Sequence, residues 1–382
     1  MNPPIRWHLA GALFALALTL PLNSAQSGSG SLFSAGPNHP RPVVSESVSN
    51  SNSAYTIIAT GLRSPRGLTF AGCNRLFVAE AGKGGTADNP ISYTGAIDEI
   101  LNPEGASSVR RIVYGLASIG DRSLGEIIGP SGLAAGRNGV ISTVIGESVD
   151  ATGNAGFGQF LDVTTSGDVE VRANVGSADY LFTLRHADLD PGGQYPDANP
   201  YAVLNLPGHT YAVDAGSNTL DEVFPNGKVK VLAYFENNIT ADSTPTCLAQ
   251  GPDGALYVGV LALVDSLVFG PSAKIYRVDP TTLPAGVIIG AAYEWATGLW
   301  PINGCAFGPD GTFYASELIT SSDFSGGDVV KIPFDDPATH ISLTDQTLPL
   351  AAGVAVGSDG TVYAVGLTAY SPSGFVARLA ER

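Results

Sequence analysis

The chain has 382 residues, of which 44% are hydrophobic, 47 are glycine and 26 are proline. This composition supplies ample core material but interrupts it with many turns, which favours numerous short strands. Only 14% of the residues are charged, and the formal net charge is −16. Such a chain repels nucleic acid and anionic lipid and has no basic patch to overcome the repulsion, so we expect no nucleic-acid partner.

The N-terminus has the pattern of a secretory signal peptide. Arg6 precedes the apolar run from Leu9 to Leu20, and the small residue Ala25 follows where such peptides are cleaved. The alternative is an uncleaved membrane anchor, but a run of about 12 apolar residues is too short to span a bilayer. No later stretch is long enough either. We therefore predict a signal peptide at residues 1–25 and a mature chain without a membrane span, either secreted or periplasmic.

Residues 26–54 are rich in serine, asparagine, proline and glycine, and they contain little that a core could bury. Such a composition is typical of a flexible linker. Folded structure is therefore expected to begin near Tyr55. One set of repeats runs through the rest of the chain, so residues 55–382 are predicted to form a single domain.

A hairpin with one plan recurs along this domain. The clearest copies are "CLAQGPDGALYVG" (247–259), "CAFGPDGTFYASE" (305–317) and "GVAVGSDGTVYAVG" (353–366), and looser copies begin at Gly67, Gly132 and Ala202. In the turn, proline presets φ, aspartate bonds the neighbouring backbone and glycine adopts a positive φ, so the chain reverses between two paired strands.

Residues 201–235 contain four strand patterns in succession, and four antiparallel strands repeated every 35 to 60 residues or so are the signature of a β-propeller blade. We predict an all-β fold, a six-bladed β-propeller, with blades at 62–116, 127–178, 200–238, 243–295, 300–348 and 350–382. The last blade has only three strand patterns. Tyr55–Gly61 is predicted to supply its fourth strand and to close the ring, which removes an exposed sheet edge.

In a propeller, the first strand of each blade lines the central channel. A proline stands at the start of five of these strands, at positions 65, 130, 200, 245 and 301. The residues predicted to face the channel mouth as a ligand-binding set are Arg66, Ser131, Tyr201, Thr246 and Asn303, with Ala352 in the last blade. These side chains differ in chemistry, while the sequence motifs around them are alike, as expected of a site on a repeated scaffold. The alternative is that they are ordinary solvated loop residues.

Acidic residues end the second strand of three hairpins: Glu80, Asp214 and Glu317. Together with Asn303 they are candidate ligands for Ca²⁺, which takes six to eight oxygen ligands. The alternative is that these acidic residues simply face water, as most acidic residues at strand ends do. The sequence is therefore compatible with calcium as a cofactor but does not require it. Metal-binding histidine spacings and the G-x-S-x-G motif are absent, and no catalytic residue is predicted.

Cys73, Cys247 and Cys305 allow at most one disulfide. Cys247 and Cys305 lie within apolar strand patterns, which is typical of small core residues, and whether they pair is open. A catalytic thiol is not expected, because no Cys–His pattern accompanies these residues.

Four segments of the chain carry a family resemblance. The runs "IIATGLRSPRGLTF", "LFVAEAGKGG", "DPGGQYPDANPYAVLNLPGHTYAVDAGSNTL" and "FGPDGTFYASEL" resemble the ScyD/ScyE family, in order from about Tyr55 to Arg382. This resemblance implies an exported propeller with NHL/TolB-like repeats and implies no reaction, because the role of that family is undefined. A fainter similarity is to gluconolactonase-type propellers: in "PINGCAFGPDG", Asn303 stands where those enzymes have a metal-binding asparagine.

Three functions remain open at this point. The first is an exported monomeric propeller that binds a small molecule, a glycan or a protein at one mouth of its channel. The second is a calcium-dependent lactonase or related hydrolase, in which the ion would polarise a carbonyl and lower the pKa of a water molecule. The third is a purely structural envelope protein.

Overall fold

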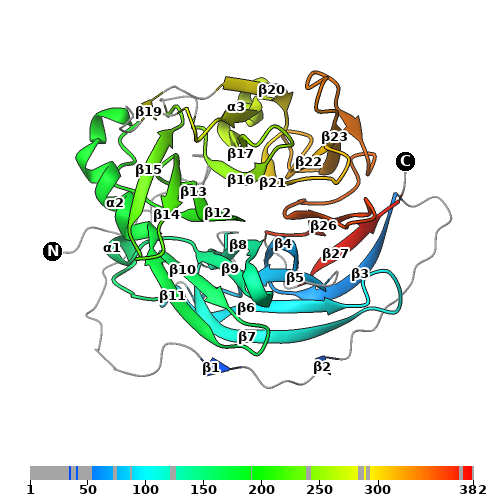
Figure 1. The fold of residues 1–382 in the computed structure, drawn as a ribbon, viewed down its shortest axis with the longest axis horizontal. Coiled ribbons are helices and arrows are strands. Elements are labelled where there is room, and N and C mark those ends of the chain that lie inside the picture. Colours follow the sequence, from blue (N-terminus) through cyan, green and yellow to red (C-terminus); the bar gives the residue numbers. More distant parts are fainter. Residues whose placement is uncertain are drawn as a thin grey trace.

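Six small antiparallel sheets stand around a central axis as the blades of a propeller (Figure 1). The computed structural model describes residues 34–35, 40–41, 54–71, 75–86, 88–120, 126–190, 192–237, 242–282, 288–289, 293–369 and 373–380. The six-bladed fold predicted from the repeated hairpins is confirmed. Among the helices of the described part, none is both long and apolar enough to cross a membrane.

The strands of each blade follow one another from the channel outward. Blade 1 contains β4 (Pro65–Ala71), β5 (Arg75–Glu80), β6 (Ile91–Leu101) and β7 (Ser108–Ile119). Blade 2 contains β8 (Pro130–Ala135), β9 (Ile141–Ile145), β10 (Gln159–Val163) and β11 (Val169–Asn174). Blade 3 contains β12 (Pro200–Leu206), β13 (His209–Asp214), β14 (Thr219–Val223) and β15 (Val229–Tyr234), with β19 (Ile288–Ile289) parallel to β15.

Blades 4 to 6 repeat this order. Blade 4 contains β16 (Pro245–Gln250), β17 (Leu256–Val260), β18 (Ala273–Val278) and β20 (Tyr293–Leu299). Blade 5 contains β21 (Ile302–Phe307), β22 (Phe313–Glu317), β23 (Asp328–Ile332) and β24 (Ile341–Ser342). Blade 6 contains β25 (Val354–Val356), β26 (Val362–Gly366), β27 (Gly374–Leu379) and, from the other end of the chain, β3 (Tyr55–Leu62).

Strand β3 closes the ring as the sequence predicts. It pairs antiparallel with β27, so that Tyr55 lies opposite Leu379 and Leu62 opposite Gly374. Its apolar residues Ile58, Ala59 and Leu62 are buried in the core shared by blades 6 and 1. The first and last parts of the propeller are therefore held in one sheet (Figure 1).

The segment predicted to be a flexible linker contains two short strands. In β1 (Ser34–Ala35), Ser34 pairs with Tyr114, and in β2 (Pro40–Arg41), Pro40 pairs with Arg110. Both therefore lie on β7, whose outer edge would otherwise offer unpaired backbone groups. The expectation that structure begins near Tyr55 thus needs this correction, while the predicted signal peptide lies outside the described residues.

Small residues let the first strands of neighbouring blades approach closely around the axis. A Cβ atom on Gly353 would lie 2.3 Å from the backbone oxygen of Arg66, and one on Gly67 would lie 2.5 Å from the backbone oxygen of Ser131. Neither position can hold a side chain without displacing backbone. The recurrent glycine of the hairpin therefore sets how tightly the blades close on the channel.

A disulfide joins Cys247 of β16 to Cys305 of β21, with 5.5 Å between their Cα atoms. The interpretation of these residues as separate small core residues was thus incomplete: they pack in the core, and they also link blades 4 and 5. Beside the bridge, the Thr246 hydroxyl donates a hydrogen bond to the backbone oxygen of Ile302 at 2.6 Å. Cys73 lies outside the described residues.

Helices occur in the connections between strands. Helix α1 (Val149–Thr152) follows β9, α2 (Val175–Arg185) lies between blades 2 and 3, and α3 (Leu263–Phe269) follows β17. Asn174 caps α2, because its side-chain oxygen accepts a hydrogen bond from the backbone N–H of Ser177. The short turns η1 (Arg137–Gly139) and η2 (Ala187–Leu189) complete the described helical elements.

Candidate functional site

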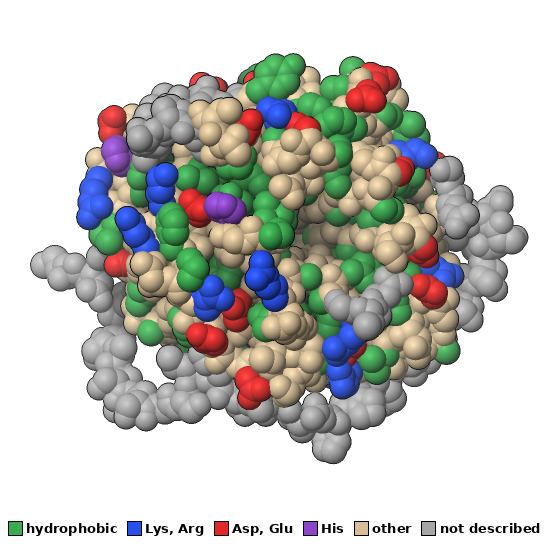
Figure 2. Space-filling view, viewed as in Figure 1, with side chains coloured by type: hydrophobic (Ala, Val, Ile, Leu, Met, Phe, Trp, Pro, Cys, Tyr) green, Lys and Arg blue, Asp and Glu red, His purple; other side chains and the backbone are tan. Residues whose placement is uncertain are grey.

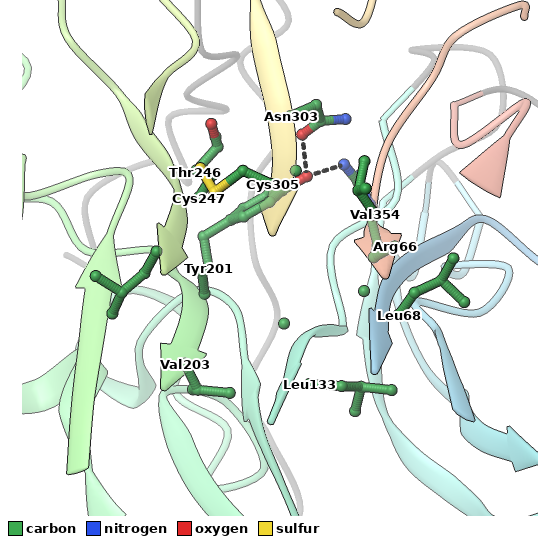
Figure 3. A pocket seen from close by; sticks show the side chains of 16 residues that line it. Arg66, Leu68, Leu133, Tyr201, Val203, Thr246, Cys247, Asn303, Cys305 and Val354 are labelled. Atoms are coloured by element: carbon green, nitrogen blue, oxygen red, sulfur yellow. Dashed lines mark hydrogen bonds between the residues drawn. A yellow bond between two sulfur atoms is a disulfide. The ribbon is translucent and has the colours of Figure 1, made fainter. Parts of the chain in front are cut away.

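A cavity of about 60 Å³ lies between the first strands of all six blades. Its lining residues occupy three successive positions along these strands, and each position is called a level; Figure 3 labels ten of the side chains. The polar level consists of Arg66, Tyr201, Thr246 and Asn303. The small level consists of Gly67, Gly132, Ala202, Cys247, Gly304 and Gly353. The apolar level consists of Leu68, Leu133, Val203, Leu248, Cys305 and Val354.

The polar residues reach the cavity through a recurrent bulge. In blades 3, 4 and 5, the pairing of the first and second strands skips one residue just after the strand begins, and the skipped residues are Tyr201, Thr246 and Asn303. Blades 1 and 2 skip two residues at the same place, of which Arg66 and Ser131 are the first. A bulge turns a side chain away from the ladder, so the same backbone feature recurs at all five predicted mouth residues, and four of them line the cavity.

Tyr201 connects three blades through its hydroxyl group (Figure 3). Arg66 Nη1 donates to this hydroxyl at 3.0 Å, and the hydroxyl donates to Asn303 Oδ1 at 2.5 Å. A guanidinium can only donate, so the tyrosine hydrogen stays available for Asn303 Oδ1, which accepts it and leaves the amide nitrogen as a donor. The Arg66 guanidinium also lies 5.7 Å from the centre of the Tyr201 ring, a cation–π distance.

The structure places four of the five predicted mouth residues on the cavity wall. These are Arg66, Tyr201, Thr246 and Asn303. The fifth, Ser131, is buried and does not line the cavity, because its hydroxyl donates to the backbone oxygen of Gly129 at 3.2 Å. Blades 1, 3, 4 and 5 thus supply the polar wall, and ligand binding by this wall remains a prediction.

The three acidic residues predicted as metal ligands instead accept hydrogen bonds from backbone. Glu317 Oε1 accepts from the N–H of Trp300 at 2.8 Å, and Glu80 accepts from the N–H of Arg63 and pairs with Arg111. Asp214 Oδ1 accepts from three N–H groups at 2.7 to 2.9 Å, those of Asn199, Gly216 and Ser217.

The position of these carboxylates explains why they accept hydrogen bonds from backbone N–H groups. Each ends a second strand next to the start of the first strand of its own blade, where backbone donors need a partner. Within the described part of the chain, no group of three or more His, Cys, Asp and Glu side chains is arranged to hold a metal ion. The structure therefore does not gather Glu80, Asp214, Glu317 and Asn303 into a calcium site, and the amide oxygen of Asn303 already accepts from Tyr201.

A group of buried carboxyls that the sequence did not predict lies under α2. Asp179 of α2, Asp214 of β13 and Asp221 of β14 are all fully buried. Burial raises the pKa of each, and Asp221 and Asp214 raise that of Asp179 further by like-charge repulsion. Burial and repulsion therefore favour a neutral, protonated form within this group. Asp179 belongs to a connection between blades, and no local pattern indicated which strands it would meet.

Two further carboxyls, Glu126 and Glu147, interact with each other outside the lining of the cavity. Burial raises the pKa of Glu147 to about 8, and Glu126 and Asp214 add to the rise. Burial also raises the pKa of Glu126, although the nearby charge of Arg66 opposes this. Burial thus favours the neutral form of both acids, and of the two, Glu126 is the one whose charge acts on Arg66.

Comparisons with known proteins show the fold alone. No protein-family model matches the sequence, and a search of curated proteins finds no match. A Bacteroides thetaiotaomicron protein of unknown function has a TM-score of 0.54 and 11% identity, over 89% of this chain and 75% of that chain. A putative oxidoreductase (glucose dehydrogenase) from Thermus thermophilus has a TM-score of 0.51 and 15% identity, over 86% of this chain and 100% of that chain.

A calcium-binding protein, regucalcin, from Agrobacterium tumefaciens has a TM-score of 0.49 and 16% identity, over 84% of this chain and 90% of that chain. Identities this low do not transfer a site or an activity between propellers. Among proteins of this fold, the function of the present chain has to be argued from its own channel.

Proposed function

We propose that this protein is a binding module that takes a small ligand in the mouth of its propeller channel. One observation carries the proposal: four blades each turn a polar side chain into the same cavity, and three of those side chains meet at the hydroxyl of Tyr201. A few convergent polar groups above an apolar lining are typical of small-molecule sites.

The positive charge of Arg66 is the strongest support. A guanidinium has five N–H donors, and among the described residues Arg66 has two acceptors, the Tyr201 hydroxyl and the Ile127 backbone oxygen at 2.7 Å. Burying a charged group with unused donors costs free energy. A ligand that supplies acceptors would offset this cost, whereas a purely structural channel would be more stable with an apolar residue.

The face of the ring shown in Figure 2 carries charges of both signs. On the face shown in Figure 2, lysine and arginine side chains are interspersed with aspartate and glutamate, and the molecule is hollowed near its centre. This distribution favours a ligand that enters the hollow over a partner that binds a broad charged patch.

The alternative is a calcium-dependent lactonase or related hydrolase. It would need an ion held by several oxygens in the channel, and the candidate carboxylates instead accept backbone N–H groups. Thermal unfolding with calcium and with a chelator discriminates the two. Stabilisation by calcium that is lost in an Asn303→Ala variant would support the hydrolase, and no response to either reagent would remove it.

Export and kinship with the ScyD/ScyE family form the second part of the proposal. The bridge between Cys247 and Cys305 supports export, because disulfides persist mainly in oxidising compartments. The ordered sequence motifs support the family. N-terminal sequencing of the mature protein from its native host tests the export, and a chain that still begins at Met1 would contradict cleavage after Ala25.

A thermal-shift screen against a library of small metabolites tests the binding function. We expect hits whose stabilisation disappears in an Arg66→Ala/Tyr201→Ala double variant. The matched control is Arg172→Ala, which removes a half-buried arginine that pairs with Asp162 on the outer strands of blade 2. Hits whose shifts survive the double variant would place binding elsewhere, and a screen without hits would remove the proposal.

A further inference from the structure

The cavity wall offers unused hydrogen-bond donors at one place. Because the Tyr201 hydrogen goes to Asn303 Oδ1, the amide nitrogen of Asn303 is left to donate, and the described residues give it no acceptor. Arg66 keeps three of its five N–H groups without an acceptor in the described part of the chain, although its Nε faces buried surroundings. Both residues contact the same hydroxyl, so their free donors are close together (Figure 3).

The charge of the wall has one sign. Arg66 is the single charged side chain among the residues that line the cavity. The acid whose charge acts on it, Glu126, lies outside the lining, and burial favours its neutral form. The hydroxyl of Thr246 has already given its hydrogen to Ile302 and adds no donor. The site is thus suited to an acceptor with a negative charge.

The size of the cavity limits the group that enters. One water molecule needs roughly 10 to 15 Å³ in this measure, so a volume of about 60 Å³ admits about four to six non-hydrogen atoms. A carboxylate with two or three carbons has this size. Its two oxygens match the fork of a guanidinium, and its carbons can contact the apolar level. A phosphate carries more charge and more acceptor oxygens than one arginine and one amide can satisfy.

We infer that the ligand binds through a small carboxylate group, which accepts hydrogen bonds from Arg66 and from the Asn303 amide nitrogen. This inference rests on the binding function proposed above and specifies its ligand class. The carboxylate belongs to a short acid or forms the end of a longer molecule that extends out of the mouth.

Matched pairs of probes test the charge. Acetate and glycolate are titrated beside acetamide and glycolamide, which have nearly the same shape without the charge, and binding is followed by saturation-transfer NMR. We expect wild-type protein to bind the carboxylates about tenfold or more tightly than the amides, because hydrogen bonds to a charged group are worth more than neutral ones.

Two variants test the residues. Arg66→Gln is expected to weaken glycolate binding about tenfold or more, while the control Arg172→Gln leaves it within about twofold. Asn303→Asp keeps the shape and the bond from Tyr201 but replaces the free donor with a negative charge, so it should abolish carboxylate binding. This second variant carries the test if Arg66→Gln proves to be unfolded by circular dichroism.

The outcomes separate the two proposals. Amides that bind as well as carboxylates, or carboxylates that bind as well to Asn303→Asp as to wild type, would overturn the carboxylate inference and leave the binding function intact. Carboxylates that fail to bind while uncharged library hits depend on Arg66 and Tyr201 would do the same. Only the absence of any hit that depends on these residues removes the binding function itself.

Discussion

Two junctions between neighbouring blades, here called seams, hold this ring together by different kinds of contact. Where blade 6 meets blade 1, the two ends of the chain are held by non-covalent contacts: β3 pairs with β27 within blade 6, and the N–H of Gly353 donates to the backbone oxygen of Arg66 at 2.9 Å. Between blades 4 and 5 the contact is covalent, through Cys247 and Cys305. The first seam joins the two ends of the chain, and the second joins segments that the chain already connects.

This difference indicates what each seam contributes to the stability of the ring. A strand from the far end of the chain can be lost as a unit, so the first seam is where the whole ring can open. The disulfide acts mainly by limiting the unfolded chain, so its loss lowers stability without changing the topology. Both seams border the cavity, since Arg66 lies at the first and Cys305 at the second.

Removing β3 is expected to have the largest effect. Without residues 55–62, blade 6 loses its outer strand and the buried Ile58, Ala59 and Leu62. Burial of such side chains contributes about 1.5 to 3 kcal/mol for each large one, and β27 also becomes an open edge. We expect the melting temperature to fall by roughly 10 °C or more, or the cooperative transition to be lost.

Deletion of residues 26–41 is the control for that experiment. It removes β1 and β2 from the outer edge of blade 1 and leaves the ring closed. Scanning calorimetry of the two truncated chains should show a much smaller fall for this control. Equal falls, or an unchanged melting temperature without β3, would contradict the role of β3 in closure.

Loss of the disulfide is expected to have the next largest effect. The bridge spans 58 residues, and the chain-entropy relation for such a loop gives about 4 kcal/mol as an upper value. In a Cys247→Ser/Cys305→Ser variant the free energy of unfolding in urea should fall by about 2 to 4 kcal/mol. Reduced wild type should unfold at the same urea concentration as the variant. A midpoint that neither change moves would mean that the bridge adds nothing to this seam.

Gly353→Ala tests the close approach at the non-covalent seam. The added Cβ would lie 2.3 Å from the Arg66 backbone oxygen, so the backbone of one blade must shift. We expect a loss of about 1 to 3 kcal/mol in urea unfolding, the usual cost of overpacking. Gly105→Ala is the control, because a Cβ there meets nothing within 4 Å. Equal small effects at both positions would show that the seam has room to relax.

The sequence predicted the fold well because the information is local and repeated. The Asp-Gly turns, the prolines at strand starts and the four strand patterns of residues 201–235 each indicate structure within a short window. The incomplete last blade made Tyr55–Gly61 the natural closing strand. The same repeated motif predicted that Arg66, Tyr201, Thr246 and Asn303 face the channel. They line the cavity because one bulge recurs in their blades.

What the sequence did not predict depends on contacts between distant segments. The pairing of Cys247 with Cys305 follows from blades 4 and 5 being neighbours, while each cysteine alone looks like a core residue. The end-of-strand acids suggested a metal because their backbone partners, such as the N–H of Trp300, are visible only in the folded chain. Asp179 reaches Asp214 and Asp221 only because α2 folds back onto blade 3.

The pH dependence of stability should come from buried carboxyls, the cluster under α2 among them, and not from the seams. The named seam contacts contain no carboxyl or imidazole. An aspartate has a pKa near 3.9 in the unfolded chain and a raised pKa in the cluster under α2, so the folded state binds more protons between these values. Stability contributed by the protonated cluster is present below about pH 4 and is lost as the pH rises through the folded-state pKa.

Asp179→Asn tests this sign. An asparagine can donate to the neighbouring carboxylates without a proton that must be retained, so the variant should be about 1 kcal/mol or more stable than wild type at pH 8. The advantage should shrink toward pH 5. The control is Asp188→Asn, at an exposed position in the same connection between blades. An advantage that is equal at both pH values would mean that Asp179 does not hold its proton in the folded state.

Tyr201→Phe distinguishes a role of this residue in stability from a role in ligand binding. It should have the smallest effect on stability. The change removes the hydroxyl that joins Arg66 to Asn303, and the open cavity lets water replace part of what is lost, so we expect about 1 kcal/mol or less in urea unfolding. Tyr93→Phe is the control, at a half-exposed tyrosine whose hydroxyl accepts from Asn154.

Ligand binding should respond differently from stability in this variant. Without the hydroxyl, the Asn303 amide is free to turn, and Arg66 loses the bond that orients it. The affinity for glycolate should therefore fall several-fold, although the free energy of unfolding changes little. A large loss of stability with unchanged affinity would instead make the Arg66–Tyr201–Asn303 contact a third seam, one that crosses the axis and ties blades 1, 3 and 5 together.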